Sequence, residues 1–201
     1  MKSSPFNIKL MQAAGLSPLK IDDDYSHVPI DSLIARQQFN ESRFKSDAVS
    51  EDGATSIAQI MPNTFKDGLE KGYVPKGTKY EDLANDDKTA TQFQENYMSD
   101  LLTRSWNTGT DQVKRAKALA AYNMGPTGLV NHLNAQKEKG IDIYKSLNWL
   151  EELNKETKDY VKNIMLGGDE DYEREFNQEY KKKFGKTKNI TPEQISGLSP
   201  L

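Results

Sequence analysis

The chain has 201 residues, with 27 basic and 30 acidic side chains, a formal net charge of -3 at pH 7 and no cysteine. This length allows one well-buried domain with an appendage, and the weak negative charge excludes the basic surface that nucleic-acid binding requires. The lack of cysteine excludes disulfides, thiolate metal sites and cysteine nucleophiles. The sequence shows no signal peptide and no membrane span, so a substrate outside the cytoplasm would require another route of delivery.

The first part of the chain leads into a helix. Residues 1–28 are predicted to be an irregular lead-in, because turn-forming residues interrupt their apolar patches. A helix is expected from Pro29 to about Glu41, since proline is tolerated in a first turn and Asp31 suits the positive end of the helix dipole. The helical period places Glu41 on the same face as the apolar residues Ile30, Leu33 and Ile34.

Short elements are expected next. Asp52-Gly53 predicts a turn, and the apolar residues in the segment 57–61 indicate a short helix that Pro62 ends. Asn63 or Thr64 would cap another helix. The glycines and proline between residues 68 and 77 then predict a loop.

Three longer helices follow from apolar residues at helical spacing. They are expected from Asp86 to Trp106, from Asp111 to Asn123 and from Leu150 to Leu166. Gly125-Pro126 and Gly167-Gly168 stop the second and third of them. Strand-like alternation of useful length is missing, so the predicted fold class is mainly α, with little or no β-structure.

A charged segment closes the chain. Residues 169–201 are predicted to be a charged C-terminal helix and tail, after a main domain over 29–168. Acidic residues precede basic ones in this segment, which suits a helix dipole, and a stripe of aromatic residues recurs every four positions: Tyr172, Phe176, Tyr180 and Phe184. The stripe either packs back on the main domain or forms a docking surface for a protein partner.

Glu41 is the leading candidate for a catalytic group. A carboxyl group among apolar groups has a raised pKa, and such a protonated acid can donate a proton to the leaving oxygen of a glycosidic bond. On helical phase alone, a solvated or helix-capping glutamate remains the alternative. Glu51 and Asp52 either supply a second carboxylate or lie solvated in their turn. His27 and His132 lack partners at metal-ligand spacing, so no metal site is predicted.

Three sequence blocks carry a resemblance to a known family. The first block comprises Glu-Ser-x-Phe, Ala-Val-Ser, Gly-Ala and Gln-Ile-Met-Pro between Glu41 and Pro62. The second is Ala-Ala-Tyr-Asn-Met-Gly-Pro at 120–126, and the third is Glu-Thr-Lys-Asp-Tyr-Val at 156–161. Together they resemble, in order and spacing, the catalytic domain of the soluble lytic transglycosylases, a lysozyme-like family related to goose-type lysozyme. The resemblance covers about residues 29 to 166 and implies a lysozyme-like helical fold.

The resemblance also implies roles for individual residues. Glu41 falls where the family has its catalytic acid, which later acts as the base. Groove positions that hold the reacting N-acetyl group correspond to Ser50, Gln59 and Met61. Further sugar contacts correspond to Tyr122 and Asn123, and the tyrosine that orients the catalytic glutamate corresponds to Tyr160.

Two departures from the family pattern stand out. The family usually reads Gly-Leu-Met-Gln where this chain has Ser56-Ile57-Ala58-Gln59, so a glycine and a methionine are lost. A side chain at Ser56 would narrow a tight approach of a helix or alter one sugar subsite. Lys158 replaces the usual arginine, which weakens any bidentate contact. Neither change affects Glu41.

The function implied by this resemblance is cleavage of peptidoglycan glycan strands between N-acetylmuramic acid and N-acetylglucosamine, with 1,6-anhydro ends and without metal or cofactor. One alternative is a lysozyme-type muramidase, in which water replaces the C6 hydroxyl and a second acid takes part. Another is a peptidoglycan-binding structural module without turnover. Activity in the periplasm or cell envelope is expected, as a phage virion component or as an excised module of a larger envelope protein.

Overall fold

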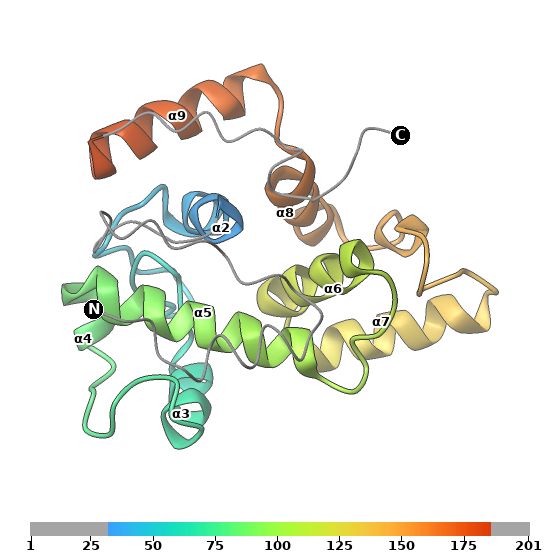
Figure 1. Cartoon of the computed structure of the whole chain (residues 1–201), viewed down its shortest axis with the longest axis horizontal. Coiled ribbons are helices and arrows are strands. Elements are labelled where there is room, and N and C mark those ends of the chain that lie inside the picture. The colour runs from blue at the N-terminus through green and yellow to red at the C-terminus, as the bar shows by residue number, and fades with distance from the viewer. Residues whose placement is uncertain (1–31, 186–201) are drawn as a thin grey trace. The chain divides into compact units, whose positions relative to one another are not determined.

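The computed structural model describes residues 32–185, and this part of the chain is built from helices (Figure 1). They are α2 (Ser32–Ser42), α3 (Pro62–Glu70), α4 (Asp82–Asn85), α5 (Asp87–Thr103), α6 (Asp111–Met124), α7 (Pro126–Glu138), η1 (Asn148–Leu150), α8 (Lys155–Leu166) and α9 (Glu170–Phe184). Within residues 32–185, β-pairing is limited to two bridges, Val49 with Thr55 and Thr55 with Ile60. The predicted fold class is therefore confirmed. The lead-in 1–28, the predicted helix start at Pro29 and the tail beyond residue 185 lie outside the described residues.

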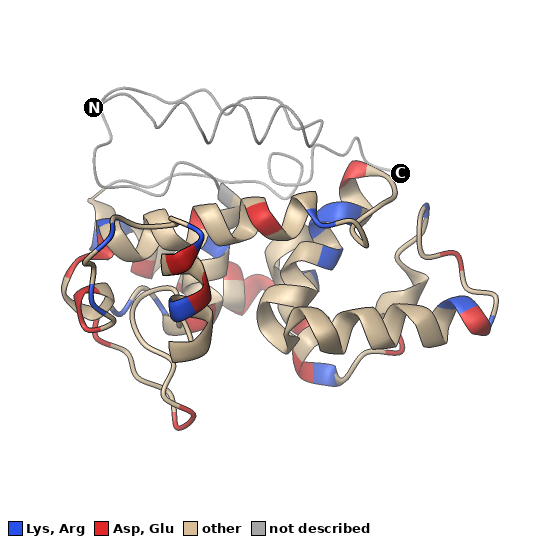
Figure 2. Ribbon diagram, turned by 90° about the horizontal axis from the view of Figure 1, so that it is seen from below, with Lys and Arg blue, Asp and Glu red and all other residues tan. Residues whose placement is uncertain are grey.

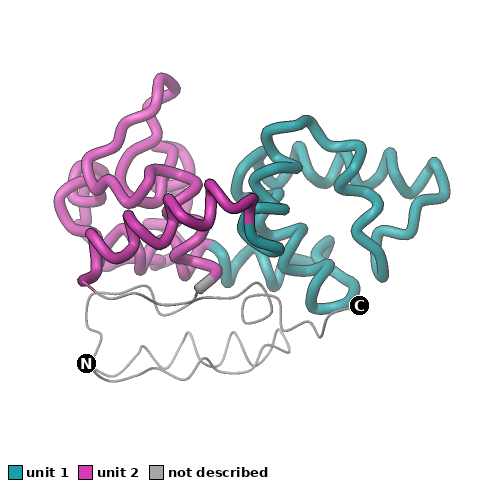
Figure 3. The backbone as a smooth tube through the Cα atoms, turned by 90° about the horizontal axis from the view of Figure 1, so that it is seen from above, with its two compact units in different colours: residues 1–18, 98–167, 191–201 teal, residues 19–97, 168–190 magenta. Residues whose placement is uncertain are grey.

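The helices belong to two compact units (Figure 3). Of the described residues, unit 1 contains 98–167 and unit 2 contains 32–97 together with 168–185. Helix α5 contributes residues to both units, and α9, although distant in sequence from α2, belongs to the same unit. The domain boundary expected at residue 168 stays a prediction.

Helix α2 is buried along almost its whole length in unit 2. All residues from 33 to 39 are buried, including the polar side chains of Arg36, Gln37 and Gln38. The Gln38 amide nitrogen donates to Thr91 Oγ1 at 3.0 Å and to Gln94 Oε1 at 2.9 Å, which ties α2 to α5. A helix buried on every face has no single apolar stripe, so the helical phase alone does not distinguish the environment of Glu41 from that of its neighbours.

Helix α9 covers α2 and the turn that follows it. Its aromatic stripe packs on Phe39 and Phe44: the Phe39 ring lies 5.1 Å from Tyr172 and 5.4 Å from Phe176. The Phe44 ring lies between 5.4 and 5.9 Å from Phe176, Tyr180 and Phe184. The interpretation that the stripe packs within the chain is therefore confirmed. Docking of a protein partner through these rings is not supported, because unit 2 already covers them.

Unit 1 is organised around α6, which packs against α7 and α8. The Thr110 side chain caps α6 by accepting from the Val113 amide, and Asn154 caps α8 by accepting from the Thr157 amide at 2.8 Å. Between α6 and α7, Gly125 has a φ of 84°, a backbone region that strongly favours glycine. Helix α7 begins directly afterwards at Pro126, whose fixed φ suits a first helical position.

Several predicted elements differ from the structure. The helix expected over 57–61 is wrong: this segment is a turn closed by the Thr55–Ile60 bridge, because Ser56 and Gln59 have positive φ angles. Pro62 does not end a helix but begins α3, and neither Asn63 nor Thr64 is its N-cap. The helix expected from Leu150 starts at Lys155, after the short η1.

Candidate active site

Glu41 is half-buried in the last turn of α2. The helix ends immediately afterwards because Arg43 and Phe44 have φ angles of 55° and 61°. The Ser42 hydroxyl donates to the Ile57 carbonyl oxygen at 2.9 Å, and the Arg43 guanidinium carbon lies 4.3 Å from the centre of the Phe39 ring. These contacts fix the backbone beside Glu41 and join it to the segment 48–61. Because three of the predicted sugar contacts lie in this segment, we call it the sugar-binding segment after that prediction.

Ser50 lies in a tight turn of the sugar-binding segment. Its amide donates to the Ala54 carbonyl at 2.9 Å, and its hydroxyl oxygen accepts from the Ala54 amide at 2.9 Å. The Gly53 amide donates back to the Ser50 carbonyl at 3.0 Å, and the Gly53 φ of 83° makes this turn a glycine position. Because the hydroxyl oxygen only accepts here, its proton can be donated to a ligand.

Gln59 is held by its amide nitrogen. Nε2 donates to the Ala48 and Ser56 carbonyl oxygens, both at 2.9 Å, and two carbonyl acceptors can only face an amide NH₂ group. The orientation of the amide is thereby fixed, and Oε1, its acceptor atom, points away from both carbonyls. Met61 follows as the N-cap residue of α3 and is 40 % exposed, so an apolar side chain is accessible two positions after Gln59.

Glu51 and Asp52 are both exposed in the turn between Ser50 and Gly53. A carboxylate that activates a water opposite the acid must be fixed against the substrate. Solvated side chains of a surface turn do not meet that requirement. The exposure agrees with the solvated alternative for these two acids.

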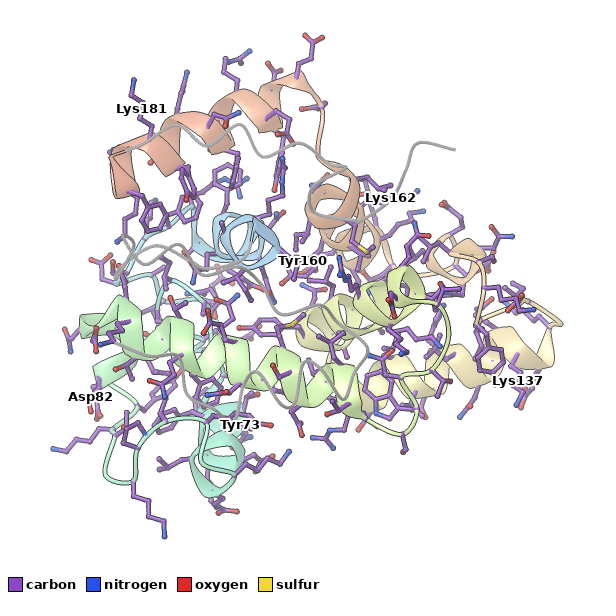
Figure 4. The ribbon with its side chains drawn as sticks, viewed as in Figure 1. Tyr73, Asp82, Lys137, Tyr160, Lys162 and Lys181 are labelled. Atoms are coloured by element: carbon purple, nitrogen blue, oxygen red, sulfur yellow. The ribbon has the colours of Figure 1, made fainter. Side chains whose placement is uncertain are left out.

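Unit 1 holds the remaining predicted site residues. Tyr122 and Asn123 lie half-buried in the last turn of α6, and Tyr160 is buried on α8 (Figure 4). The Thr157 hydroxyl donates to Asn123 Oδ1 at 2.7 Å, which leaves the Asn123 NH₂ group as the donor for a ligand. Thr157, buried at 1 % exposure, is a supporting residue that sequence analysis missed. Its place in the third sequence block was the available signal.

Some polar side chains near these residues are engaged elsewhere. Lys158, at the position of the family arginine, lies 3.7 Å from Glu151 Oε2 on the exposed face of α8.

Within residues 32–185, no cluster of three or more His, Cys, Asp or Glu side chains could hold a metal ion. None of the described helices has the length and hydropathy needed to cross a membrane.

Comparisons with known proteins identify the family. A family model described as the transglycosylase SLT domain matches residues 31–145, more than half of the chain. The chain belongs to the transglycosylase SLT domain family. Both the expected family and the expected class of enzyme agree with this match. The matched range includes six of the predicted site residues, and Tyr160 lies beyond it.

Two solved structures show the same fold. An inactive mutant of the lytic transglycosylase Slt from Pseudomonas aeruginosa is 23% identical, with a TM-score of 0.54, over 92% of this chain and 25% of that one. The 70 kDa soluble lytic transglycosylase from Escherichia coli is 19% identical, with a TM-score of 0.58, over 93% of this chain and 27% of that one. This SLT-domain chain thus spans about a quarter of either solved protein. The comparison with curated proteins gave no match.

Proposed function

We propose that this SLT-domain chain is a peptidoglycan lytic transglycosylase that cleaves the β-1,4 bond between N-acetylmuramic acid and N-acetylglucosamine. Family membership supports the class of reaction. The observation that carries the proposal is the half-buried Glu41 at the end of α2, joined through Ser42 to a segment rich in oriented, uncharged hydrogen-bonding groups. Such groups suit a neutral, hydroxyl-rich substrate.

In the proposed reaction, one carboxyl group acts twice. Protonated Glu41 donates its proton to the leaving glycosidic oxygen as the bond to C1 breaks, while the N-acetyl group of the muramyl sugar stabilises C1. Ionised Glu41 then removes the proton of the C6 hydroxyl, and the C6 oxygen bonds to C1 to close the 1,6-anhydro ring. Because the C6 hydroxyl is tethered to the reacting sugar, its proximity replaces a positioned water.

The sugar contacts are proposed residue by residue. In unit 2, the Ser50 hydroxyl donates a hydrogen bond, Gln59 Oε1 accepts one, and Met61 provides an apolar contact. In unit 1, we assign sugar contacts to Tyr122, to the Asn123 NH₂ group and to Tyr160. The substrate sets the place of action at the cell envelope, and we keep a phage virion component or a module of a larger envelope protein as the two proposed settings.

The mass of the product tests the proposed reaction. Purified sacculi treated with the protein are expected to release muropeptides with 1,6-anhydro ends, each one water lighter than a lysozyme product, because ring closure consumes no water. Glu41→Gln should lower the rate by ~10²–10⁴, since the amide cannot exchange the catalytic proton.

Glu51→Ala and Asp52→Ala serve as the matched controls and should both retain activity. Reducing ends, together with loss of activity in either control variant, would instead identify a muramidase. Retention of more than about a tenth of the activity by Glu41→Gln would remove that residue from its role, because the loss expected of a general acid is at least ~10².

A further inference from the structure

Tyr80 reaches the sugar-binding segment from the loop between α3 and α4. Its hydroxyl oxygen lies 2.7 Å from the Gly53 carbonyl oxygen and 2.6 Å from the Ile60 carbonyl oxygen. Both acceptors are backbone atoms of unit 2, and Tyr80 belongs to the same unit. A phenol has one proton, so the two carbonyls share it. The sequence blocks discussed above do not include this tyrosine.

The two carbonyl groups belong to two separate parts of the segment that presents the proposed sugar contacts. Gly53 closes the turn that holds Ser50, because its backbone amide donates a hydrogen bond to the Ser50 carbonyl at 3.0 Å. Ile60 lies between Gln59 and Met61, and its carbonyl also accepts from the Thr55 amide at 3.1 Å. One hydroxyl group therefore contacts both the turn that holds Ser50 and the backbone between Gln59 and Met61.

The tyrosine is itself held rigidly. Its ring centre lies 5.5 Å from that of Phe65, which is buried on α3. The Tyr80 carbonyl accepts from the amide of Leu83, a fully buried residue of α4, at 3.2 Å. The Asp82 carboxylate accepts from the Lys79 amide at 2.7 Å and so closes the turn before α4. These contacts fix the Tyr80 hydroxyl relative to α3 and α4, and its hydrogen bonds fix the segment relative to the same two helices.

The phenol remains a donor at the pH of the reaction. Burial raises the pKa of Tyr80 above its ordinary value, against a smaller opposing effect of the Thr55 backbone. The group is therefore protonated throughout the neutral range. Without the hydroxyl, the Gly53 carbonyl loses this partner and the Ile60 carbonyl keeps only its bond from Thr55, so the segment is free to relax.

We propose that Tyr80 is a positioning residue for substrate binding: its hydroxyl group holds the sugar-binding segment in the shape that aligns Ser50, Gln59 and Met61 with the glycan. This inference rests on the proposed function. It assigns Tyr80 no contact with the reacting atoms. The expected effect of removing the hydroxyl is therefore on affinity and not on the chemical step.

Tyr80→Phe tests this role because it keeps the ring packed on Phe65 and removes only the hydroxyl. With soluble glycan strands as substrate, we expect KM to rise about tenfold and kcat to change less than about twofold, as for loss of a hydrogen bond that acts on binding alone. Tyr144→Phe is the matched control, since Tyr144 is 41 % exposed and outside the proposed site. An unchanged KM, or a loss confined to kcat, would overturn the inference.

A second measurement separates positioning from loss of stability. Hydrogen exchange of the Thr55 and Ile60 amides should accelerate in Tyr80→Phe, while core amides of α5 keep their protection. Uniformly faster exchange across unit 2 would mean that the hydroxyl stabilises the fold only. Phe65→Leu, which withdraws ring support and leaves the hydroxyl in place, should raise KM in the same direction by a smaller factor.

Binding in the Glu41→Gln background makes the two proposals independently testable. That variant is expected to bind glycan strands and to cleave them only slowly, and adding Tyr80→Phe should weaken the measured Kd about tenfold. If wild-type protein yields no anhydro ends, the proposed function fails. If wild-type protein yields them and the two variants bind equally, only the role of Tyr80 fails.

Discussion

Ser56 is a residue whose side chain conflicts with its backbone. It is fully buried and has a φ of 78°, a region in which a Cβ atom is strained by roughly 1–2 kcal/mol. The family pattern has glycine at this position, and the structure supplies the reason. The Ser56 amide donates to the Ala48 carbonyl at 3.0 Å, while its own carbonyl accepts from Gln59 Nε2 at 2.9 Å. These two bonds hold the strained conformation in place.

Ser56→Gly is therefore expected to stabilise the protein. The relieved strain exceeds the ~0.4–1 kcal/mol that glycine costs through the unfolded chain, although the 3.3 Å contact between Ser56 Oγ and the Ala58 amide is lost. We expect a rise of about 1–3 °C in Tm, measured by thermal unfolding. Ser56→Ala keeps the strain and loses the hydroxyl, so its Tm should fall. A Tm for Ser56→Gly below that of Ser56→Ala would contradict this explanation.

Among the elements, α9 is joined to the helix that bears Glu41 by an ion pair, a hydrogen bond and ring contacts. The buried Arg36 guanidinium binds the Glu173 carboxylate in a bidentate pair, at 2.5 and 2.8 Å, and lies 4.8 Å from the Phe176 ring centre. The Asn40 amide, next to Glu41, donates to the Tyr172 hydroxyl at 2.6 Å. Burial raises the pKa of Tyr172 to about 12, so this hydroxyl stays neutral at any pH at which the protein works. Helix α9 thus holds the residues around the proposed acid in place through these contacts.

Glu173→Ala is expected to destabilise unit 2 by about 3 kcal/mol, because it leaves the fully buried Arg36 charge without its carboxylate. Urea unfolding measures this loss. Adding Arg36→Met to the same variant should recover most of it, since the buried charge that lost its carboxylate is then no longer present. Glu175→Ala is the matched control: its partner Arg43 is 41 % exposed, and such pairs contribute less than ~1 kcal/mol. Equal losses for Glu173→Ala and Glu175→Ala would refute this account.

For the whole molecule, the charge pattern predicts little electrostatic contribution to the proposed capture of substrate. The net charge is only -3, and Figure 2 shows both basic and acidic residues among the described helices. Several of the described ion pairs join residues three or four positions apart in the sequence, such as Lys155 with Asp159 and Lys182 with Glu179. Long-range attraction is therefore weak, and the proposed glycan binding would depend on short-range contacts.

The expected dependence of the reaction on salt follows from this weak long-range attraction. Between about 0.05 and 0.3 M NaCl, the Debye length falls by more than half. We nevertheless expect KM for uncharged glycan oligomers to change less than about twofold, because hydrogen bonds and apolar contacts carry the binding. Steady-state rates across this range provide the measurement. A KM that rises steeply with salt would show that charged groups of the protein capture the substrate.

Local sequence signals were sufficient for two long helices whose structure depends on neighbouring residues. The helices expected from Asp86 to Trp106 and from Asp111 to Asn123 agree closely with α5 (Asp87–Thr103) and α6 (Asp111–Met124). Helical spacing and end signals act over one or two turns, so they can be read directly from the chain. The motif blocks likewise predicted the family, because their order and spacing are themselves properties of the sequence.

Tertiary structure decided what depends on distant contacts. The turn at 57–61 replaces a helix because Ser56 and Gln59 are held at positive φ by bonds to Ala48, and that interaction leaves no periodic pattern. The aromatic spacing of α9 predicted a stripe but not its partners, Phe39 and Phe44, which are more than a hundred residues away in the sequence. Tyr80 could not be singled out for the same reason: its two carbonyl acceptors, at Gly53 and Ile60, meet its hydroxyl only once the chain has folded.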